Sequence, residues 1–335
     1  MIRDLALPLS IAALFAAMPV SAGDLLVGNK SADTVWRLST KDGSRIGQFA
    51  TGQGPHEIVV SDDNRFALVS NYGAATPGRS ITVLDLRKPG GTRTLDLGDN
   101  GRPHGMRLLP GGNRIVVTTE ASRKLLLVDV ASGRVEHEID LGEGRGHMVA
   151  VSRDGNTAFV TKIDAGTVSR VDLAARTKTH EVPAGAGAEG VAVHPASGEV
   201  WVSNREAGTV TVHDPKTLAI RRTIASEGFP IRVVFTSDGR HALVTNARAA
   251  TLSVIDTNKY AVAHTVALSR PGVEYRETML GRAALPIGVI ADPKLPRVYA
   301  AVSGGDELAV IDTEQWKVID HWKTGREPDA LGIVE

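Results

Sequence analysis

The sequence predicts an all-β protein, and specifically a seven-bladed β-propeller with four antiparallel strands in each blade. A short β-rich phrase recurs along the chain at intervals of about 40–45 residues, which is the period of a propeller or array. Each phrase closes on an aspartate, at Asp85, Asp129, Asp172, Asp214, Asp256 and Asp312. We expect these aspartates to accept hydrogen bonds from backbone N–H groups in the turn that follows.

Each repeat unit divides into four strands, as the unit that begins near residue 228 illustrates. Its first strand starts at a proline and covers 230–235, and a tight turn with Asp and Gly follows at 237–239. The second strand covers 242–246, and the Asp-terminated phrase at 251–256 is the third. The fourth strand of a unit is more polar, as at 134–141, and this polarity suits an outer edge.

The two ends of the chain supply the seventh unit. The six continuous units begin near residues 54, 101, 144, 187, 228 and 286. Residues 326–334 resemble a lone first strand, and 25–29, 34–38 and 46–49 resemble the missing second, third and fourth strands. Pairing them closes the ring and removes its exposed edges. Residues 23–335 are therefore expected to form a single propeller domain, because one blade cannot bury its faces alone.

The N-terminal residues 1–22 have the pattern of a signal peptide. Arg3 precedes an apolar run at 5–18, and Val20, Ser21 and Ala22 fit a small-residue cleavage site. The alternative is an uncleaved anchor, although the run is short for a membrane span. We therefore expect a periplasmic or secreted protein whose mature chain has no membrane span.

Composition excludes several classes of function. The 335 residues carry a formal net charge of +0, which gives no electrostatic reason to expect nucleic acid as a partner. Aromatic residues make up 4% of the chain, too few for a base-stacking platform. The chain has 0 Cys, which excludes disulfides, thiolate ligands, thiol nucleophiles and thioether haem attachment. The sequence also contains no phosphate-binding Gly loop before a helix and no Gly-x-Ser-x-Gly motif.

The repeats resemble the YVTN β-propeller repeat family, a group of exported bacterial and archaeal propellers. The resemblance is carried by second strands at 68–71, 201–204 and 243–246 and by third strands such as 251–256. It covers almost the whole mature chain and implies an exported seven-bladed propeller. Related propellers include streptogramin lyases and lactone hydrolases, but no full catalytic set from either can be placed here. Fold alone does not assign an activity, so catalytic residues stay unassigned.

Aligning the first strands predicts a ring of side chains at one mouth of the central channel. Its members are His56, His104, His147, Glu189, Ile231, Ile287 and Asp329. The three imidazoles and Glu189 could hold a divalent transition metal such as zinc or copper. A histidine could instead act as a general acid or base. In a third interpretation the polar ring binds channel water and strand ends through hydrogen bonds.

A second predicted ring follows from the ends of the second strands and the residues just after them. The candidate ligand-binding residues in this ring are Asn71, Tyr72, Lys162, Asn204, Arg205 and Asn246. Lys162 is the one cation at the strand ends of this ring and could meet an anionic ligand. The alternative for each asparagine is a role in the local turn.

One segment breaks the repeat period. Residues 269–285 lie between a fourth strand and the next first strand, on the face that carries the predicted histidine ring. Insertions in repeat arrays map to loops that often bind ligands, so Tyr275 and Arg276 are candidate ligand-binding residues. A tolerated surface insertion is the alternative.

Three classes of function fit these patterns. The leading hypothesis is an exported binding or accessory protein that holds a small ligand, a metal or a protein partner at the channel face. A second is a metal-assisted hydrolase or lyase with a His-lined channel site. A third is a structural envelope or surface interaction protein. No cofactor is certain from the sequence, and a divalent transition metal is the one that its residues favour.

Overall fold

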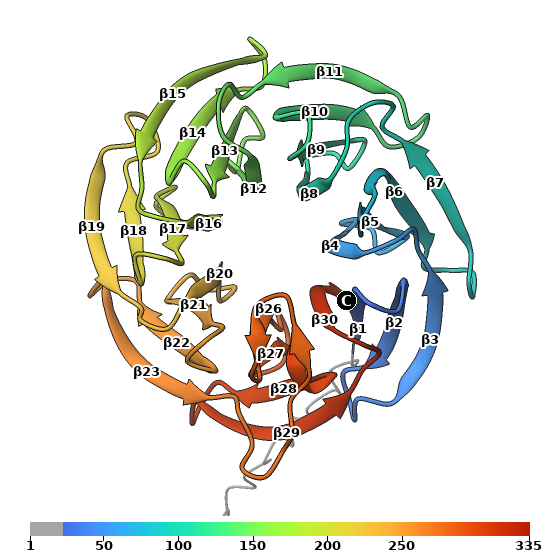
Figure 1. The fold of residues 1–335 in the computed structure, drawn as a ribbon, viewed down its shortest axis with the longest axis vertical. Helices are drawn as coiled ribbons and strands as arrows, with labels where there is room; N and C mark the ends of the chain where they lie inside the picture. Colours follow the sequence, from blue (N-terminus) through green and yellow to red (C-terminus); the bar gives the residue numbers. More distant parts are fainter. Residues whose placement is uncertain (1–22) are drawn as a thin grey trace, which may run out of the picture.

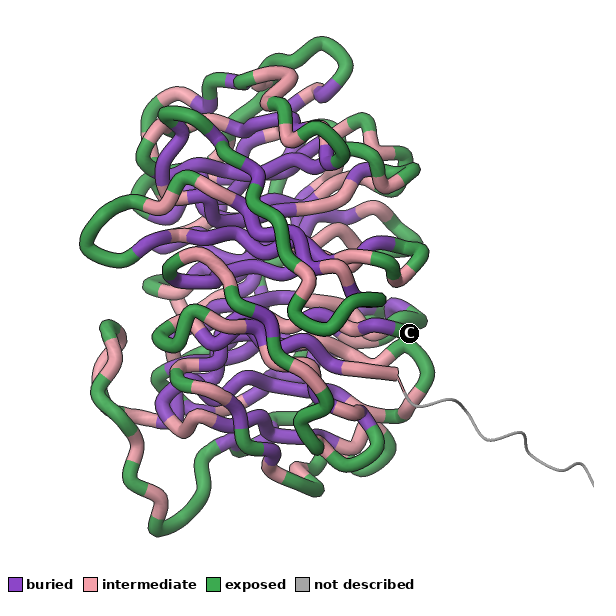
Figure 2. The backbone as a smooth tube through the Cα atoms, turned by 90° about the vertical axis from the view of Figure 1, so that its right-hand side faces the viewer, coloured by how far each residue is buried: buried purple, intermediate pink, exposed green. Residues whose placement is uncertain are grey.

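The computed structural model describes residues 23–335 and forms a closed ring of seven blades (Figure 1). Each blade is a sheet of four antiparallel strands, which confirms the fold class predicted from the repeats. The predicted signal peptide at residues 1–22 lies outside the described residues. Buried segments run through the body of the ring, and exposed loops project from its two faces (Figure 2).

The first three blades follow one another along the chain. The first consists of β4 (Pro55–Val60), β5 (Phe66–Gly73), β6 (Pro77–Asp85) and β7 (Thr92–Asp96). The second consists of β8 (Pro103–Leu108), β9 (Arg114–Thr119), β10 (Lys124–Asp129) and β11 (Val135–Asp140). The third consists of β12 (Gly146–Val151), β13 (Thr157–Lys162), β14 (Thr167–Asp172) and β15 (Thr177–Pro183).

The next three blades complete the continuous part of the ring. The fourth consists of β16 (Ala188–Val193), β17 (Val200–Asn204), β18 (Thr209–His213) and β19 (Ile220–Ala225). The fifth consists of β20 (Pro230–Phe235), β21 (His241–Asn246), β22 (Thr251–Asp256) and β23 (Ala261–Ala267). The sixth consists of β26 (Pro286–Ala291), β27 (Arg297–Val302), the 3-10 turn η1 (Ser303–Gly305), β28 (Glu307–Asp312) and β29 (Lys317–Lys323).

The seventh blade joins the two ends of the described chain, as the sequence predicts. Its strands are β30 (Pro328–Val334), β1 (Asp24–Asn29), β2 (Thr34–Ser39) and β3 (Arg45–Ala50). β30 pairs with β1 in antiparallel register, with Asp24 opposite Val334 and Leu25 opposite Ile333. The C-terminal strand therefore closes the ring by supplying the innermost strand of the seventh blade.

The core lies between neighbouring blades. Each hydrophobic cluster takes residues from two adjacent sheets, as Leu68 and Ile81 of the first blade pack with Met106 and Ile115 of the second. Strands that contribute to both faces of the stack read as nearly continuous apolar runs, for example β10. Burial between blades is therefore the dominant stabilising term for the ring.

The recurrent aspartates stabilise the turns between third and fourth strands, as expected. Asp129 accepts a hydrogen bond from the Ser132 backbone N–H at 2.8 Å. Asp214 accepts one from the Lys216 backbone N–H at 2.8 Å. The same contact recurs in six blades, and its acceptors are Asp85, Asp129, Asp172, Asp214, Asp256 and Asp312.

A β-bulge interrupts every first strand at the position of the predicted histidine ring. In the first blade Pro55 pairs with Asn71 and Ile58 with Val69, so two residues, His56 and Glu57, lie opposite Ser70 alone. The same register shift occurs in the other six blades. Bulges re-aim side chains and are common beside functional sites. Here they determine which first-strand residues face the channel.

In five of the seven blades a hydroxyl on the second strand ties the bulge to the next blade, whereas Ala301 and Gly28 occupy this position in the other two. Ser70 accepts a hydrogen bond from the Glu57 backbone N–H at 3.0 Å and donates to the carbonyl of His104 at 3.1 Å. Thr161 makes the same pair of contacts, accepting from Met148 N–H and donating to the carbonyl of Glu189. Ser203 and Thr245 repeat them. The ring residues are thus anchored through their own backbones.

The insertion forms a small hairpin on the face where the first strands begin. It contains β24 (Glu277–Thr278) and β25 (Gly281–Arg282), which pair with each other. Leu280 and Ala283 pack on a buried cluster that includes Phe229 and Ile231. Among residues 23–335, no helix has the length and apolar character that crossing a bilayer requires.

Candidate functional site

Three imidazoles meet at the hub, as the alignment of first strands predicts. The ring centroids of His56 and His104 are 4.1 Å apart, and those of His104 and His147 are 3.8 Å apart. Gly105 permits this approach, because a Cβ there would lie 2.8 Å from the His147 carbonyl oxygen and 2.6 Å from the Val149 nitrogen. The absence of a side chain at Gly105 therefore brings β8 and β12 close enough for their imidazoles to come into contact, with their planes tilted by 40°.

Two carboxylates hold His147 between them. Its Nδ1 lies 2.5 Å from Glu120 Oε1, and its Nε2 lies 3.2 Å from Glu189 Oε1. The Tyr72 hydroxyl donates to Glu120 Oε2 at 2.5 Å, and the Arg205 guanidinium donates to Glu189 Oε2 at 2.9 Å. These five side chains form one hydrogen-bonded chain that crosses four blades.

The imidazoles of His104 and His147 differ in charge because their surroundings differ. Burial by itself lowers the pKa of His147, but Glu189 and Glu120 outweigh burial and raise it to about 9. Burial and the neighbouring charge of His147 hold the pKa of His104 well below its usual range. At neutral pH His147 is therefore an imidazolium and His104 a neutral imidazole. Pairs separated in this way can act as acid and base.

Tyr72 and the carboxylates of this chain also depart from ordinary behaviour. Burial and the neighbouring Glu120 raise the pKa of Tyr72 to about 12, so its hydroxyl keeps its proton. For Glu120 and Glu189, burial raises the pKa, but contact with His147 outweighs it and lowers the pKa of both. The carboxylates are therefore ionised and balance the imidazolium.

One ring nitrogen of His104, Nδ1, makes no hydrogen bond within the described chain. Its side chain is 1% exposed, its Nδ1 is buried, and that nitrogen has no hydrogen-bond partner among residues 23–335. An unpaired buried nitrogen costs free energy, roughly 1–3 kcal/mol, unless something else fills the role of partner. Such groups occur where a structure waits for a ligand, an ion or a water.

His56 also belongs to a second group of charged residues in the channel. Its Nδ1 lies 3.2 Å from Asp329 Oδ2, although no hydrogen bond is aligned between them. Arg232 forms an ion pair with Glu57 across the channel and lies 3.6 Å from Asp329 Oδ1. Burial raises the pKa of Asp329, but His56, Lys30 and Arg232 outweigh it and lower that pKa.

A cavity of about 900 Å³ opens above this floor. His56, Tyr72, His104, Glu120, His147, Glu189 and Arg205 line it. The hairpin of the insertion contributes Thr278, Met279 and Leu280 to the wall. Ligand pockets typically measure roughly 300–1,000 Å³. A separate cavity of about 350 Å³ lies on the other side of Arg232 and Asp329, so their ion pairs divide the channel.

The cations at the mouth of the cavity are partly uncompensated. Lys30 lies 3.7 Å from Asp329, and Arg145 lies 3.3 Å from Asp164. Arg102 stacks over the Tyr72 ring at 4.9 Å and, within the described chain, forms no ion pair with a carboxylate. Its Nη2 donates to the Ala74 carbonyl at 3.2 Å, and the remaining N–H groups of the guanidinium are available to an anionic group that enters the cavity.

Arg102 is also held in a strained backbone conformation. Its φ of 57° lies in the left-handed region, as do those of Leu285 at 51° and Glu327 at 56°. The equivalent residues Gly54 and Gly187 adopt the same conformation without strain. Arg102, Leu285 and Glu327 all line the cavity. Strain in non-glycine residues collects at functional sites, so these side chains are candidates for a role there.

Four predicted ligand-binding residues are not brought to the cavity. The amides of Asn71, Asn204 and Asn246 bond to hydroxyls of the third strand in their own blades. Lys162 is fully buried and donates to the carbonyl of Glu143 at 2.7 Å and to Glu181 Oε2 at 2.9 Å. These contacts fit the alternative expectation of a local structural role for the asparagines, although Asn204 Oδ1 is buried without a partner among residues 23–335.

The two predicted residues of the insertion also lie away from the cavity wall. The Tyr275 hydroxyl accepts a hydrogen bond from the Arg270 backbone N–H at 2.7 Å. The Arg276 guanidinium forms an ion pair with Asp306. The neighbouring residues Met279 and Leu280 reach the cavity instead. The turn of the hairpin therefore places a different part of the insertion at the cavity than the sequence predicts.

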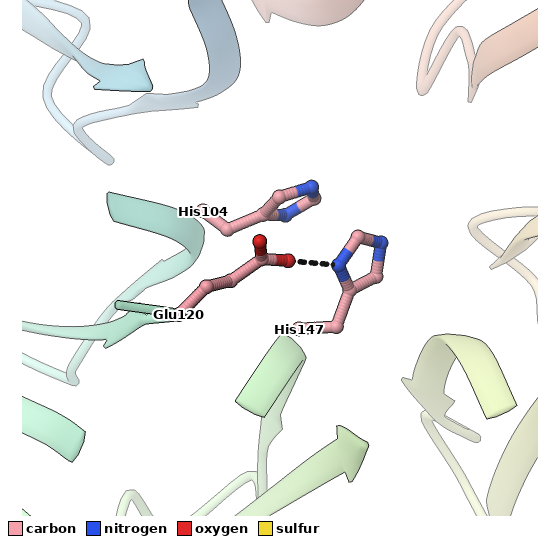
Figure 3. Close-up of side chains that lie close together, drawn as sticks. All are labelled: His104, Glu120 and His147. Carbon is pink, nitrogen blue, oxygen red and sulfur yellow. Dashed lines mark hydrogen bonds and ion pairs between the residues drawn. The ribbon is translucent and has the colours of Figure 1, made fainter. Parts of the chain in front are cut away.

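The side chains that lie close enough to share a metal ion differ from the predicted set of His56, His104, His147 and Glu189. Glu189 contacts the outer nitrogen of His147, and His56 faces Asp329. The donor atoms that come together belong to His104, Glu120 and His147, within 4.8 Å of one another (Figure 3). Glu120 follows β9 directly, so ring position alone does not select it. Glu120 could have been predicted from its position one residue after the end of β9, on the face of the ring where the first strands begin.

Arg232 and Glu57 are the residues that sequence reasoning left out of the site. The position after each ring residue is filled mostly by small residues, Gly105, Gly190, Gly288 and Ala330. Met148 is the one large apolar residue at this position, and Glu57 and Arg232 are the two charged ones, which pair with each other across the axis. That pattern is visible in the aligned repeats and would have predicted the ion pair.

Fold and site together define a class: a seven-bladed propeller whose channel is closed by ion pairs and whose hub cavity is floored by histidines. The family model described as the cytochrome D1 heme domain matches residues 106–278, just over half of the chain. The chain therefore belongs to this family. A second model, the YNCE-like beta-propeller, matches residues 19–154. The YVTN assignment stays a prediction within this broader group of bacterial seven-bladed propellers.

The chain is also similar to proteins called Uncharacterized protein YncE from Salmonella typhi and Salmonella typhimurium. Each is 27% identical over 190 residues, which is 56% of this chain and 52% of the relative. The chain thus spans about half the length of the curated relatives it matches.

Three solved structures share the fold. A functionally unknown protein from Desulfotomaculum acetoxidans has a TM-score of 0.78 at 14% identity, covering 94% of this chain and 99% of that one. Kuenenia stuttgartiensis Hydrazine Synthase has a TM-score of 0.69 at 19% identity, covering 82% and 88%. The dihydro-heme d1 dehydrogenase NirN in complex with DHE has a TM-score of 0.65 at 14% identity, covering 97% and 77%. At these identities the likeness concerns the fold.

Proposed function

We propose that this protein is an exported binding or accessory propeller that holds a haem-type tetrapyrrole in its hub cavity. The observation that carries the proposal is a cavity of about 900 Å³ with an imidazole, His56, available in its wall. The family match to a heme domain and the fold shared with NirN support the choice of ligand class.

The donor set fits such a ligand. The His56 side chain makes no hydrogen bond with the described residues, and its Nε2 is not among the buried atoms, so that nitrogen is open to the cavity. Its Nδ1 faces Asp329 at 3.2 Å. A carboxylate behind an imidazole orients the ring and raises its basicity toward a metal. His56 is therefore the residue we assign to the iron of the haem.

The rest of the cavity matches the periphery of a tetrapyrrole. Leu280, Leu285 and Ile287 offer apolar surface, and Arg102 and Lys30 offer charges for carboxylate groups. A bound haem would supply a redox-active iron. The protein's own residues bind and orient the group, and the hairpin limits the access of water. The ion pairs of Arg232 close the channel behind it, so the cavity is a dead end.

The test is a titration of purified protein, treated first with a chelator, with hemin. We expect one hemin per chain and a shift of its main absorption band that reports imidazole ligation. His56→Ala should weaken hemin binding at least tenfold, because the loss of a ligand typically costs as much. The matched control is His180→Ala, which removes an exposed imidazole of β15. Equal hemin affinity of the parent and His56→Ala would exclude this assignment.

Export is part of the proposal and has its own measurement. The pattern of residues 1–22 supports it. Expression of the full chain in a bacterium, followed by fractionation and intact mass, should give a periplasmic or secreted protein that begins at Gly23. A cytoplasmic protein that retains residues 1–22 would contradict it.

A further inference from the structure

We propose that His104, Glu120 and His147 form a binding site for one divalent first-row transition metal ion, separate from the residue assigned to haem. One donor atom from each of the three residues lies within 4.8 Å of the others (Figure 3). All three side chains are buried, with exposed fractions of 1%, 3% and 8% for His104, Glu120 and His147. A small inward movement of these atoms would bring them to the spacing of ligands around one ion.

The chemistry of the donors selects the class of ion. Two imidazoles and one carboxylate are typical of sites that bind Zn²⁺, Co²⁺ or other first-row divalent ions and keep a fourth position open. Ca²⁺ and Mg²⁺ prefer oxygen ligands, so this set disfavours them. The buried, unpartnered Nδ1 of His104 is a nitrogen donor that no described residue uses.

The surrounding residues orient each proposed ligand. Tyr72 donates to Glu120, and Glu189 contacts the nitrogen of His147 that faces away from Glu120. Arg205 in turn holds Glu189 at 2.9 Å. Metal-binding imidazoles and carboxylates usually have such partners behind them.

The open position of this site would face the ligand cavity. His104, Glu120 and His147 all line the same wall. The centroid of the His56 ring is 4.1 Å from that of His104, so the two sites are neighbours. A ligand in the cavity could therefore contact both the imidazole of His56 and an ion held by the other three residues. The metal site does not depend on the haem proposal, since it uses none of the same ligands.

The experiment uses the mature protein stripped with a chelator and no other ligand. Zn²⁺ is titrated by calorimetry, and Co²⁺ by visible absorption, which reports its coordination. We expect one ion per chain. His104→Ala and the isosteric Glu120→Gln should each weaken the affinity for Zn²⁺ at least tenfold, since each removes one of three protein ligands. His180→Ala should leave it unchanged.

Two further measurements separate the possible failures. Thermal unfolding of each variant verifies folding, and Glu120→Gln keeps the shape of the side chain if His104→Ala does not fold. His56→Ala should lose hemin affinity and retain Zn²⁺ affinity, so the haem and metal proposals fail independently. The metal site is overturned if the parent binds no Zn²⁺, or if Glu120→Gln binds it as tightly as the parent.

Discussion

Arg102 has a strained backbone conformation that positions its charged side chain at the cavity. It occupies a left-handed conformation with φ of 57°, directly before Pro103, where the first and fourth blades have glycine. Such a conformation costs about 1–2 kcal/mol for a residue with a Cβ. The strained position places the guanidinium over Tyr72, inside the cavity wall. Glycine would adopt this conformation without strain, so the turn by itself does not require an arginine.

Arg102→Gly should therefore separate stability from binding. Relief of strain and the larger entropy of the unfolded chain oppose each other, so the free energy of unfolding should change by less than about 1 kcal/mol. Hemin affinity should fall about tenfold, because a charge-assisted contact to a carboxylate is lost. Urea unfolding and hemin titration measure the two effects, and Arg102→Lys, which keeps a charge, should lie between them. An unchanged hemin affinity in Arg102→Gly would remove this residue from the site.

At the scale of single elements, the small polar residues of the second strand make two different kinds of contact. Ser70 and its equivalents join a bulge of their own blade to the carbonyl of a ring residue in the next blade. Asn71 and its equivalents fasten the turn to the third strand. The short motif at the end of the second strand is therefore a connector between blades, which explains why it recurs.

The hairpin of β24 and β25 is the element that covers the cavity. Leu280 packs on the cluster around Phe229 and Ile287, whereas Met279 at the tip is 92% exposed. The hairpin is thus held to the ring by few apolar contacts. Elements with few buried contacts open locally at low free-energy cost.

Leu280→Ser should release the hairpin without unfolding the ring. Loss of a half-buried apolar contact costs about 1 kcal/mol locally, so the segment should open more often. Limited proteolysis should cleave near residues 277–282 several times faster, while the thermal midpoint changes little. Met279→Ser is the matched control and should be cleaved at the rate of the parent. Equal cleavage of all three proteins would show that Leu280 does not anchor the hairpin.

At the scale of the whole molecule, the ion pairs of Arg232 connect opposite sides of the ring. Arg232 lies on β20, Glu57 on β4 and Asp329 on β30, and the Arg232 Nη1 also approaches Met148 Sδ of β12 at 3.1 Å. Burial lowers the pKa of Arg232, but Glu57 and Asp329 outweigh it and raise that pKa. The charge is therefore permanent, and the channel stays divided.

Arg232→Met should destabilise the protein strongly, because Glu57 and Asp329 are left buried without a counter-charge. Breaking one partner of a buried pair typically costs about 3–5 kcal/mol. The free energy of unfolding in urea should show this loss, and the added change Glu57→Gln should recover part of it. A difference below about 1 kcal/mol between Arg232→Met and the parent would mean that water or other groups already solvate the two carboxylates.

The sequence by itself determined the architecture and the crowding of the hub. The spacing of the aspartate-terminated phrases set the number of blades, and the strands at residues 25–29 and 326–334 set the closure. The position of His56, His104 and His147 at equivalent points predicted that their rings would meet. These features follow from repetition, since every blade obeys the same local rules of strand, turn and burial.

The tertiary structure alone decided which donors are free. Asn71, Asn204, Asn246 and Lys162 have the right chemistry, but their side-chain nitrogens donate to groups of their own blades. Glu120, from outside the ring, lies against His147 instead. A bulge in each first strand and the missing Cβ of Gly105 set the distances between imidazoles. Hydrogen-bond partners and charge states depend on contacts between blades that are far apart in the chain. The sequence pattern within one repeat therefore cannot predict them.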